Sequence, residues 1–390
     1  MNESIMLGDC LELLPKIPTE SVDLIYLDPP FFSQKKQKLQ TRDGSRNYAF
    51  EDCWLNLDAY REYIKLRLEQ CRRVLKETGS LFLHCDRSAS HHLRFALDQV
   101  FGNENFQSEI IWSYRRWSNA KKGLLNAHQV IFFYSKGPNF KFNQIYDSYS
   151  PTTNLDQILQ ERVRDERGKS VYKTDTDGNS VIINDKKGVP LSDVWEIPYL
   201  NPKAKERVSY PTQKPIILIE KIIQLVTDVG DLVLDPFAGS GTTLVASKLL
   251  GRKFLGMDQS KDAVDLTTSR LNNPIRSESA LLKRGIGAYQ NQDLETEEIL
   301  GTLGAMVVQR NKGIDGFIRT ENGLVPVKIK KPNETLDEAI GKLARASAKN
   351  AYTRQVLFLS KKSDEVKDYA KDGLLILSDP TEVKAALSSK

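Results

Sequence analysis

DLVLDPFAGSGTT, residues 231–243, is the stretch of this chain that decides the fold. Its apolar run at 232–234 predicts a buried strand, and the glycines at 239 and 241 predict a tight turn before a helix over 242–250. A further strand, expected at 253–257, ends about 20 residues after the turn at an acid that can accept hydrogen bonds from ribose hydroxyls. Tight packing alone also explains such glycines, but acids at both strand ends, Asp235 and Asp258, favour a nucleoside site.

Apolar runs and amphipathic segments alternate on both sides of this stretch. Strands are expected at residues 22–27, 80–85, 110–114 and 129–134, and helices at 58–76, 90–101 and 216–226. The alternation predicts a mostly parallel sheet with helices on both faces. A polar segment at 138–212, with a hairpin expected at 175–179, interrupts it, and Asn272-Asn273-Pro274 ends the first domain. Residues 284–390 form a second, smaller α/β pattern.

Asp28-Pro29-Pro30-Phe31 follows the first expected strand. The lone pair of a base amine is delocalised into the ring, and it would become localised if the Asp28 carboxylate and the Pro29 carbonyl accepted the two N–H groups. Consecutive prolines hold a carbonyl rigidly, and Phe31 offers a stacking face for a base removed from a duplex. A proline-rich loop that only caps a strand is the alternative. The position at the ligand-binding edge of the same sheet favours the catalytic interpretation.

Together the two motifs resemble the amino-methyltransferases of DNA in their permuted, beta-class arrangement. In that family the Asp-Pro-Pro-aromatic motif precedes the Phe-x-Gly-x-Gly motif, as 28–31 precede 237–241 here, and the resemblance covers roughly residues 4–272. It extends to Gly8-Asp9-Cys10, to Ser80–Asp86 and to residues 210–215. The resemblance implies a Rossmann-like α/β fold with a seven-stranded sheet, one strand of it antiparallel, in which the strands of Asp9 and Asp258 are neighbours.

The resemblance also implies a reaction. Residues 1–275 would form an S-adenosyl-L-methionine-dependent domain that flips adenine out of duplex DNA and methylates N6 without a covalent enzyme intermediate. The implied catalytic residues are Asp28, Pro29, Pro30 and Phe31. The implied cofactor residues are Asp9, Cys10, Lys214, Asp235, Phe237, Ala238, Gly239, Gly241, Thr242, Thr243, Asp258 and Gln259. Among them, Asp9 would contact the adenine end of the cofactor, Asp258 its ribose, and Asp235 with Thr242 and Lys214 its methionine end.

Three other functions are open at this point. N4-cytosine methylation is chemically parallel, and the family more often has Ser where this chain has Asp28, so adenine is favoured. A catalytically inactive DNA-binding protein fused to a nuclease is disfavoured by the intact Asp28, Gly239 and Gly241. Methylation of RNA or protein is the third. The chain has no Pro-Cys dipeptide, which argues against the cysteine-dependent C5-cytosine mechanism.

Basic and aromatic residues interleave over 112–122. Trp112, Tyr114 and Trp117 suit base stacking, and we expect Arg115, Arg116 and Lys121 to contact DNA. An edge strand with a solvated basic loop explains the individual residues equally well. The segment 138–212 occupies the usual place of a target-recognition region, and its bases either contact DNA or form a solvated surface.

The C-terminal segment resembles the restriction-endonuclease-like fold, in which an Asp precedes an acid-x-Lys on the next strand. Asp315 and Lys328 are present, but Pro326 occupies the acid position. Nucleases of that fold bind Mg²⁺ with two carboxylates. We therefore expect residues 284–390 to be a non-cleaving relative that binds DNA.

Composition sets outer limits on the function. A net charge of +5, from 56 basic and 51 acidic residues, permits a nucleic-acid partner without demanding one. Four unpaired cysteines, no basic-then-apolar N-terminus and no apolar run of about 20 residues indicate a cytoplasmic protein with reduced thiols. No metal site is expected, because the histidines lack partners at ligand spacing. The expected partners are double-stranded DNA, a second copy of the chain and a companion restriction endonuclease, with no membrane.

Overall fold

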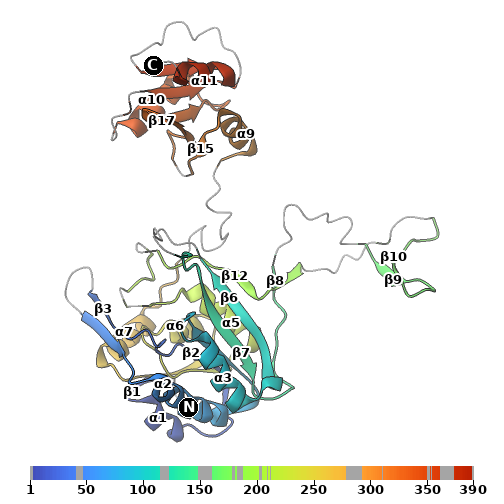
Figure 1. The fold of residues 1–390 in the computed structure, drawn as a ribbon. Coiled ribbons are helices and arrows are strands. Elements are labelled where there is room, and N and C mark those ends of the chain that lie inside the picture. Colours follow the sequence, from blue (N-terminus) through green and yellow to red (C-terminus); the bar gives the residue numbers. More distant parts are fainter. Residues whose placement is uncertain are drawn as a thin grey trace. The chain divides into compact units, whose positions relative to one another are not determined.

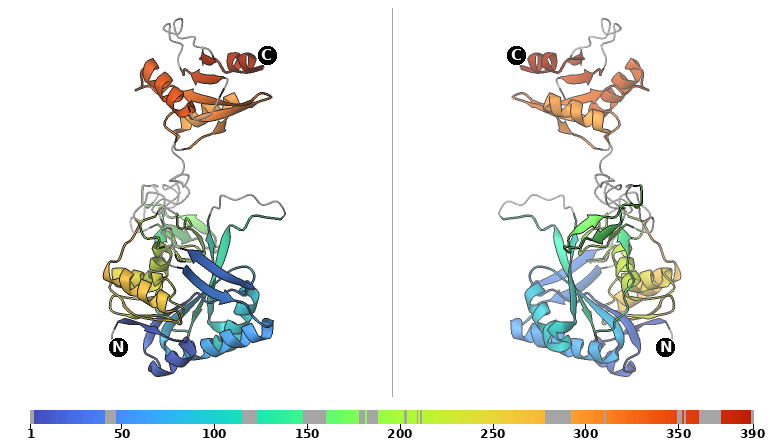
Figure 2. Two further views of the ribbon diagram at one scale, coloured as in Figure 1. Left: turned by 90° about the vertical axis from the view of Figure 1, so that its left-hand side faces the viewer. Right: turned by 90° about the vertical axis from the view of Figure 1, so that its right-hand side faces the viewer.

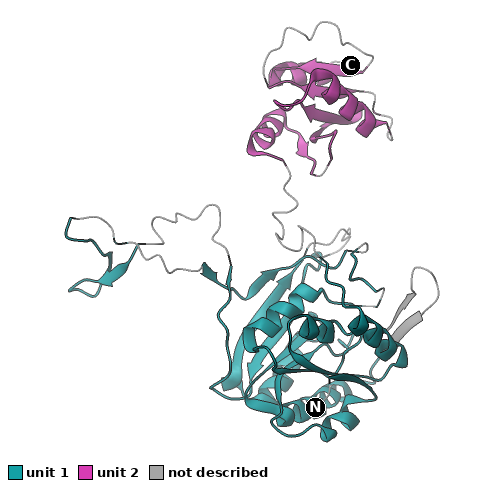
Figure 3. Ribbon diagram, turned by 180° about the vertical axis from the view of Figure 1, so that it is seen from behind, with its two compact units in different colours: residues 1–282 teal, residues 283–390 magenta. Residues whose placement is uncertain are grey.

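The computed structural model divides the chain into two compact units, Met1–Leu282 and Lys283–Lys390 (Figure 3). The division falls between the expected domains 1–275 and 284–390. The described residues are 3–40, 47–114, 123–147, 160–177, 181, 188–201, 204–208, 210, 212–277, 292–309, 311–348, 352, 354–360 and 373–388. Among the helices of these residues, we find none with the length and apolar character needed to cross a bilayer.

Unit 1 is built on a sheet of eight described strands in the order β1-β14-β13-β2-β5-β7-β6-β12 (Figure 1). The strands are β1 (Ser4–Leu7), β2 (Val22–Leu27), β5 (Leu75–Cys85), β6 (Phe106–Ser113), β7 (His128–Ser135), β12 (Val194–Glu196), β13 (Leu232–Asp235) and β14 (Lys253–Asp258). Strand β7 is antiparallel to β5 and β6, and the other pairs are parallel. The expected single antiparallel strand and the neighbouring β1 and β14 are confirmed.

The expected count of seven strands is too low. Strand β12 pairs with β6 from within the polar segment 138–212 and buries Trp195. It has only three residues, with an exposed–buried–exposed pattern, which is too short to register as an alternating run.

Helices cover both faces of the sheet (Figure 2). They are α1 (Cys10–Leu13), α2 (Leu57–Val74), α3 (Ser90–Phe101), α5 (Ile216–Val226), α6 (Thr242–Leu249) and α7 (Lys261–Asn272). Successive strand residues point to opposite faces, so Ile25 and Leu27 join the apolar core beneath α1, α2 and α3. Leu24 and Tyr26 join a second core beneath α5 and α6. The expected α/β sheet with helices on both faces is confirmed.

A hairpin that was not expected stands between β2 and α2. Its strands are β3 (Lys35–Gln40) and β4 (Asn47–Asp52), paired antiparallel from Lys35↔Asp52 to Gln40↔Asn47. Within 138–212 the structure has the short pair β8 (Tyr146–Asp147) with β11 (Val189–Pro190). It also has a hairpin of β9 (Arg162–Arg164) and β10 (Ser170–Tyr172). Residues 178 and 179 of the hairpin expected at 175–179 lie outside the described residues.

Unit 2 has a five-stranded sheet in the order β15-β16-β17-β18-β19. Its elements are α9 (Leu294–Leu303), β15 (Met306–Val307), β16 (Gly316–Thr320), β17 (Gly323–Ile329), α10 (Leu336–Ser347), β18 (Gln355–Phe358), β19 (Leu374–Leu377) and α11 (Pro380–Ser388). Strands β15–β17 are antiparallel, and β17, β18 and β19 are parallel. One core lies beneath α9 and α11 and another beneath α10, so unit 2 is also an α/β layer structure.

Candidate active site

Aspartates stand at the carboxyl ends of five adjacent parallel strands. Asp9 follows β1, Asp258 ends β14, Asp235 ends β13, Asp28 follows β2 and Asp86 follows β5. Ligands bind at this edge of open α/β sheets. A cavity of about 700 Å³ opens there, and four of the five acids line it, all except Asp9.

The glycine-rich turn forms one wall of the cavity. Gly239 and Gly241 have φ of +50° and +74°, in the left-handed region that favours glycine. A Cβ at Gly241 would lie 2.4 Å from Thr267, and one at Gly239 would lie 3.2 Å from the Tyr210 ring. The turn therefore needs glycine at both positions, and the missing side chains let its backbone lie close to a ligand.

Most of the expected cofactor residues line this cavity. They are Cys10, Lys214, Asp235, Phe237, Ala238, Gly239, Thr242, Thr243, Asp258 and Gln259. The two that do not are Asp9 and Gly241, which precede α1 and α6. A cavity with a glycine cradle and acids at neighbouring strand ends suits a ligand that has hydroxyl and ammonium donors.

Asp9 is engaged by protein donors. Its carboxylate accepts the Leu11 N–H at 2.8 Å, which caps α1, and both oxygens accept from the Arg67 guanidinium at 2.8 and 2.7 Å. The Gln259 amide donates to Oδ2 at 2.7 Å. Arg67 comes from α2 and is buried. Beside this pair, burial raises the pKa of the Cys10 thiol to about 12, which keeps it protonated.

Asp235 is buried and Asp258 is half-buried at the edge of the cavity. Asp258 accepts the Gly239 and Ser260 N–H groups, each at 2.8 Å, so the glycine turn is tied to the end of β14. Burial raises the pKa of Asp258, against these two hydrogen bonds. Burial also raises the pKa of Asp235 to about 7, against hydrogen bonds from Thr243 and from the Phe237 N–H at 3.0 Å.

Lys214 contacts Asp28. Its ammonium donates to Asp28 Oδ2 and, at 3.3 Å, to the Thr212 carbonyl, and it lies 5.5 Å from the centroid of the Phe31 ring. Burial raises the pKa of Asp28, and the Lys214 ammonium opposes that rise. The pair joins a residue expected at the methionine end of the cofactor to the first residue of the Asp-Pro-Pro-Phe motif.

The neutral ring of His84 lies beside Phe31. The ring centroids of Phe31 and His84 are 6.1 Å apart, and burial holds the pKa of His84 well below its usual range. Its Nδ1 lies 2.7 Å from the Tyr26 hydroxyl and its Nε2 lies 2.9 Å from Gln129 Oε1. A neutral imidazole has one donor and one acceptor nitrogen, so Nε2 donates to Gln129 and Nδ1 accepts from Tyr26.

Residues 22–269 match the N6_N4_Mtase family model, described as DNA methylase. The chain belongs to this family. It is 30% identical over 275 residues to the Type II methyltransferase M.HinfI of Haemophilus influenzae, spanning 69% of this chain and 68% of that protein. It is also 30% identical over 273 residues to the Type II methyltransferase M.HpaI of Haemophilus parainfluenzae, spanning 70% of this chain and 75% of that protein. The chain is therefore a DNA methyltransferase with S-adenosyl-L-methionine as its cofactor.

Two solved structures are similar at low sequence identity. The cytosine-N4-specific PvuII DNA methyltransferase has a TM-score of 0.47 and 20% identity, over 70% of this chain and 88% of that one. The M1.HpyAVI–SAM complex has a TM-score of 0.42 and 18% identity, over 69% and 98%.

The expected DNA-contacting residues of the methyltransferase, Arg115, Arg116 and Lys121, lie outside the described residues. The aromatic residues before them are described, and the structural alternative left open for individual residues holds for Trp112 and Tyr114. Trp112 is fully buried and donates its indole N–H to the Ile197 carbonyl at 2.7 Å, and Tyr114 is buried beside it. Both belong to the apolar core that also includes residues of α5. Trp112 shares a face of β6 with the buried Ile110, because alternate strand residues point to the same side.

Several cavity residues were missed from the sequence. They are Tyr26, Asp52, Trp54, Tyr63, Asp86, Gln129 and Tyr199. Asp86 could have been found, since it follows an expected strand in the same way as Asp28. The others come from β2 (Tyr26), the end of β4 and the segment after it (Asp52, Trp54), α2 (Tyr63), β7 (Gln129) and the segment after β12 (Tyr199). No local motif marks them.

Proposed function

We propose that this enzyme methylates N6 of adenine in duplex DNA, on a base flipped into the cavity. The observation that carries the proposal is the adjacency of β2 and β13, which pair through Leu24↔Val233 and Ile25↔Leu234. It brings Asp28 and the glycine turn, far apart in sequence, to one cavity. A base amine at Asp28 and a sulfonium methyl held by the turn could then meet in line.

The residues of the cavity suit this acceptor. Lys214 occupies Asp28 Oδ2, so Oδ1 is the oxygen that would accept an N–H of the amine, with the Pro29 carbonyl accepting the other. Phe31 would stack on the base. S-adenosyl-L-methionine supplies an electrophilic methyl group. With the cofactor bound, the Asp28 carboxylate would stabilise the positive charge that develops on the base nitrogen and would be placed to receive the displaced proton.

The choice of adenine over N4 of cytosine rests on Asp28, where the N4 enzymes more often have Ser. Incubation with a duplex library and digestion of the product to nucleosides would identify the methylated base by mass spectrometry. N6-methyldeoxyadenosine is expected. N4-methyldeoxycytidine would replace this proposal with the parallel one, and an unmethylated product would remove both.

We propose a beta-class enzyme, because residues 28–31 precede the turn at 237–241. We place target recognition in 138–212 and phosphate contacts at Arg115, Arg116 and Lys121. We also propose that the enzyme belongs to a restriction–modification system with a companion endonuclease, because both relatives above are Type II methyltransferases. We propose in addition that it is cytoplasmic and acts as a homodimer. Light scattering of the purified protein tests the dimer.

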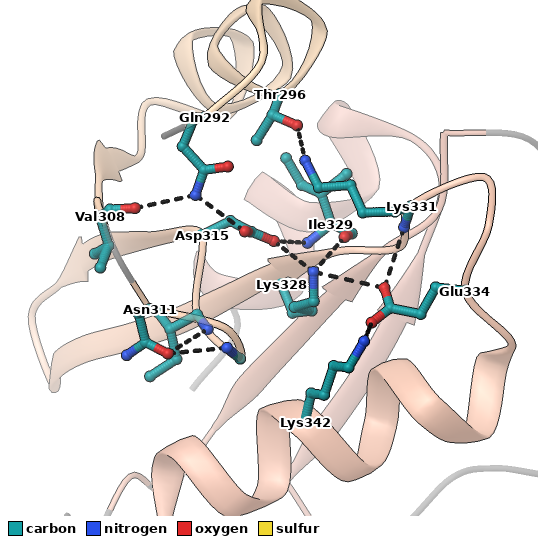
Figure 4. A network of polar contacts seen from close by, with 12 residues as sticks. Gln292, Thr296, Val308, Asn311, Asp315, Lys328, Ile329, Lys331, Glu334 and Lys342 are labelled. Atoms are coloured by element: carbon teal, nitrogen blue, oxygen red, sulfur yellow. Dashed lines mark hydrogen bonds and ion pairs between the residues drawn. The ribbon is translucent and has the colours of Figure 1, made fainter. Parts of the chain in front are cut away.

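For residues 284–390 we propose a restriction-endonuclease-like domain that binds DNA and does not cut it. Lys328 is buried on β17 and donates to Asp315 Oδ2 at 2.9 Å and to the Ile329 carbonyl at 2.8 Å. Pro326, two residues earlier, occupies the position at which nucleases of this fold have a metal-binding acid. Figure 4 shows that a second carboxylate nevertheless reaches this cluster, from Glu334 just before α10. Glu334 comes from the loop before α10 and not from β17, so the position of Pro326 on the strand does not reveal it.

The charges of the cluster support the absence of cleavage. The Lys328 ammonium lies 3.6 Å from Glu334 Oε2, and the Lys342 ammonium lies 2.7 Å from Oε1 (Figure 4). Two carboxylates are thus balanced by two ammonium groups, which leaves no net negative charge to attract Mg²⁺. Supercoiled plasmid should stay intact with the full-length protein and Mg²⁺ or Mn²⁺. Cleavage that is lost in Asp315→Ala would make the chain a combined methyltransferase and nuclease.

A further inference from the structure

The loop that follows Asp28 has an unusual backbone. Phe32 and Gln34 have φ of +58° and +54°, in the left-handed region that residues with a Cβ seldom adopt. Such conformations persist where the surrounding structure holds them, and they cluster at functional sites. This loop begins at Phe31, the proposed stacking residue.

One carboxylate binds three successive N–H groups of this loop. Asp52, at the end of β4, accepts the Phe31, Phe32 and Ser33 N–H groups at 3.2, 3.0 and 2.7 Å. It also accepts the Trp54 indole N–H at 2.9 Å. Each Asp52 oxygen receives two of the four donors, so the acceptor sites of the carboxylate are filled. The side chain is buried, with 2% exposure.

Further contacts tie the same loop to its surroundings. The Gln34 side-chain amide donates to the Trp54 carbonyl at 3.1 Å and accepts the Trp54 N–H at 2.8 Å. On the other side of Phe31, the Tyr60 hydroxyl donates to the Pro30 carbonyl at 2.9 Å. The hairpin β3–β4 and helix α2 thus hold the loop at both ends.

We propose that Asp52 is a positioning residue, which fixes the Phe31 ring and the preceding Pro29 carbonyl in the geometry that the flipped base requires. Successive backbone N–H groups that converge form an anion-binding concavity, and the Asp52 carboxylate occupies the one formed by Phe31, Phe32 and Ser33. Because four protein donors fill the carboxylate, Asp52 acts through the loop and does not contact the base. This inference rests on the proposed function.

The test compares Asp52→Asn and Asp52→Ala with a matched control, Asp58→Asn, which removes a carboxylate that is 89% exposed. Turnover on duplex DNA is measured per S-adenosyl-L-methionine site, and cofactor affinity by calorimetry. We expect kcat to fall by about 100-fold in Asp52→Asn, since a misplacement of about 1 Å can cost that much. The fall should be larger in Asp52→Ala, which keeps no acceptor oxygen. Cofactor affinity should be unchanged in both, and kcat should be unchanged in Asp58→Asn.

A second variant tests the inference if Asp52→Asn does not fold. Gln34 is exposed, so Gln34→Leu should fold, lower kcat and leave cofactor affinity unchanged. The inference is overturned if kcat is preserved in Asp52→Asn, if cofactor affinity falls in parallel with kcat, or if Asp52→Asn unfolds and Gln34→Leu keeps full kcat. Failure of the proposed function itself would be seen separately, as the absence of methyl transfer by the unaltered protein in the same assay.

Discussion

Asp258→Ala should weaken the binding of S-adenosyl-L-methionine while the enzyme stays folded. Each oxygen of this carboxylate already accepts one backbone N–H, from Gly239 or Ser260 at 2.8 Å. One acceptor site per oxygen is left for the ribose hydroxyls. A hydrogen bond to a charged acceptor contributes about 1.5–3 kcal/mol, which corresponds to a loss of affinity of roughly 10- to 150-fold at about 1.4 kcal/mol per factor of ten.

The assay is calorimetric titration of the cofactor into folded protein. Asp262→Ala is the matched control, because it removes an exposed carboxylate from the first turn of α7 and should leave affinity unchanged. Thermal melting of the protein without cofactor measures the stability lost with the Gly239 and Ser260 contacts. The titration measures the affinity lost with the ribose contact. Unchanged affinity in a folded Asp258→Ala variant would refute the ribose assignment, and an equal loss in Asp262→Ala would assign the effect to net charge.

Further predictions concern the acceptor site and unit 2. Asp28→Ala should abolish methyl transfer and keep cofactor affinity, as measured by calorimetry beside a transfer assay; activity within a few-fold of the unaltered protein would exclude the catalytic role. Lys214→Met should move the acid limb of the pH–kcat profile to higher pH. Burial raises the pKa of Asp28 and the ammonium opposes that rise, so without Lys214 the carboxylate needs a higher pH to be charged; an unmoved limb would contradict this. Truncation near residue 283 should preserve cofactor affinity and lower DNA affinity, and the loss should shrink at high salt if phosphate contacts cause it. A loss that is independent of salt in fluorescence anisotropy would rule those contacts out.

Residues that belong to one strand-end motif could be predicted from the sequence. Asp28, Asp235 and Asp258 each follow an apolar run, and parallel strands bring their carboxyl ends to one edge. The helices at 90–101 and 216–226 have the expected bounds, since their apolar residues recur at helical spacing. These features depend on local pattern alone.

Residues that act across the fold could not be predicted in this way. Arg67 lies on an ordinary amphipathic helix, and its pairing with Asp9 depends on how α2 packs beside α1. Asp52 gains its role from the hairpin β3–β4, which was not expected from the sequence, and Glu334 gains its role from the loop before α10. Trp112 shows the opposite case. It stands among interleaved basic and aromatic residues, which are typical of a nucleic-acid-binding surface, yet it is buried on β6.

The pairing of β2 with β13 has a consequence for the order in which the enzyme is assembled. A chain emerging from the ribosome exposes the Asp28 loop early, whereas the glycine turn and Asp258 follow only after some 200 further residues. Both strands must then insert side by side, with β14 closing against β1. No shorter nascent chain holds the two halves of the site, so methyl transfer begins only when synthesis has passed β14. A cut within the polar segment 138–212 would leave the Asp28 loop and the glycine turn on separate fragments, so neither fragment would hold the whole site.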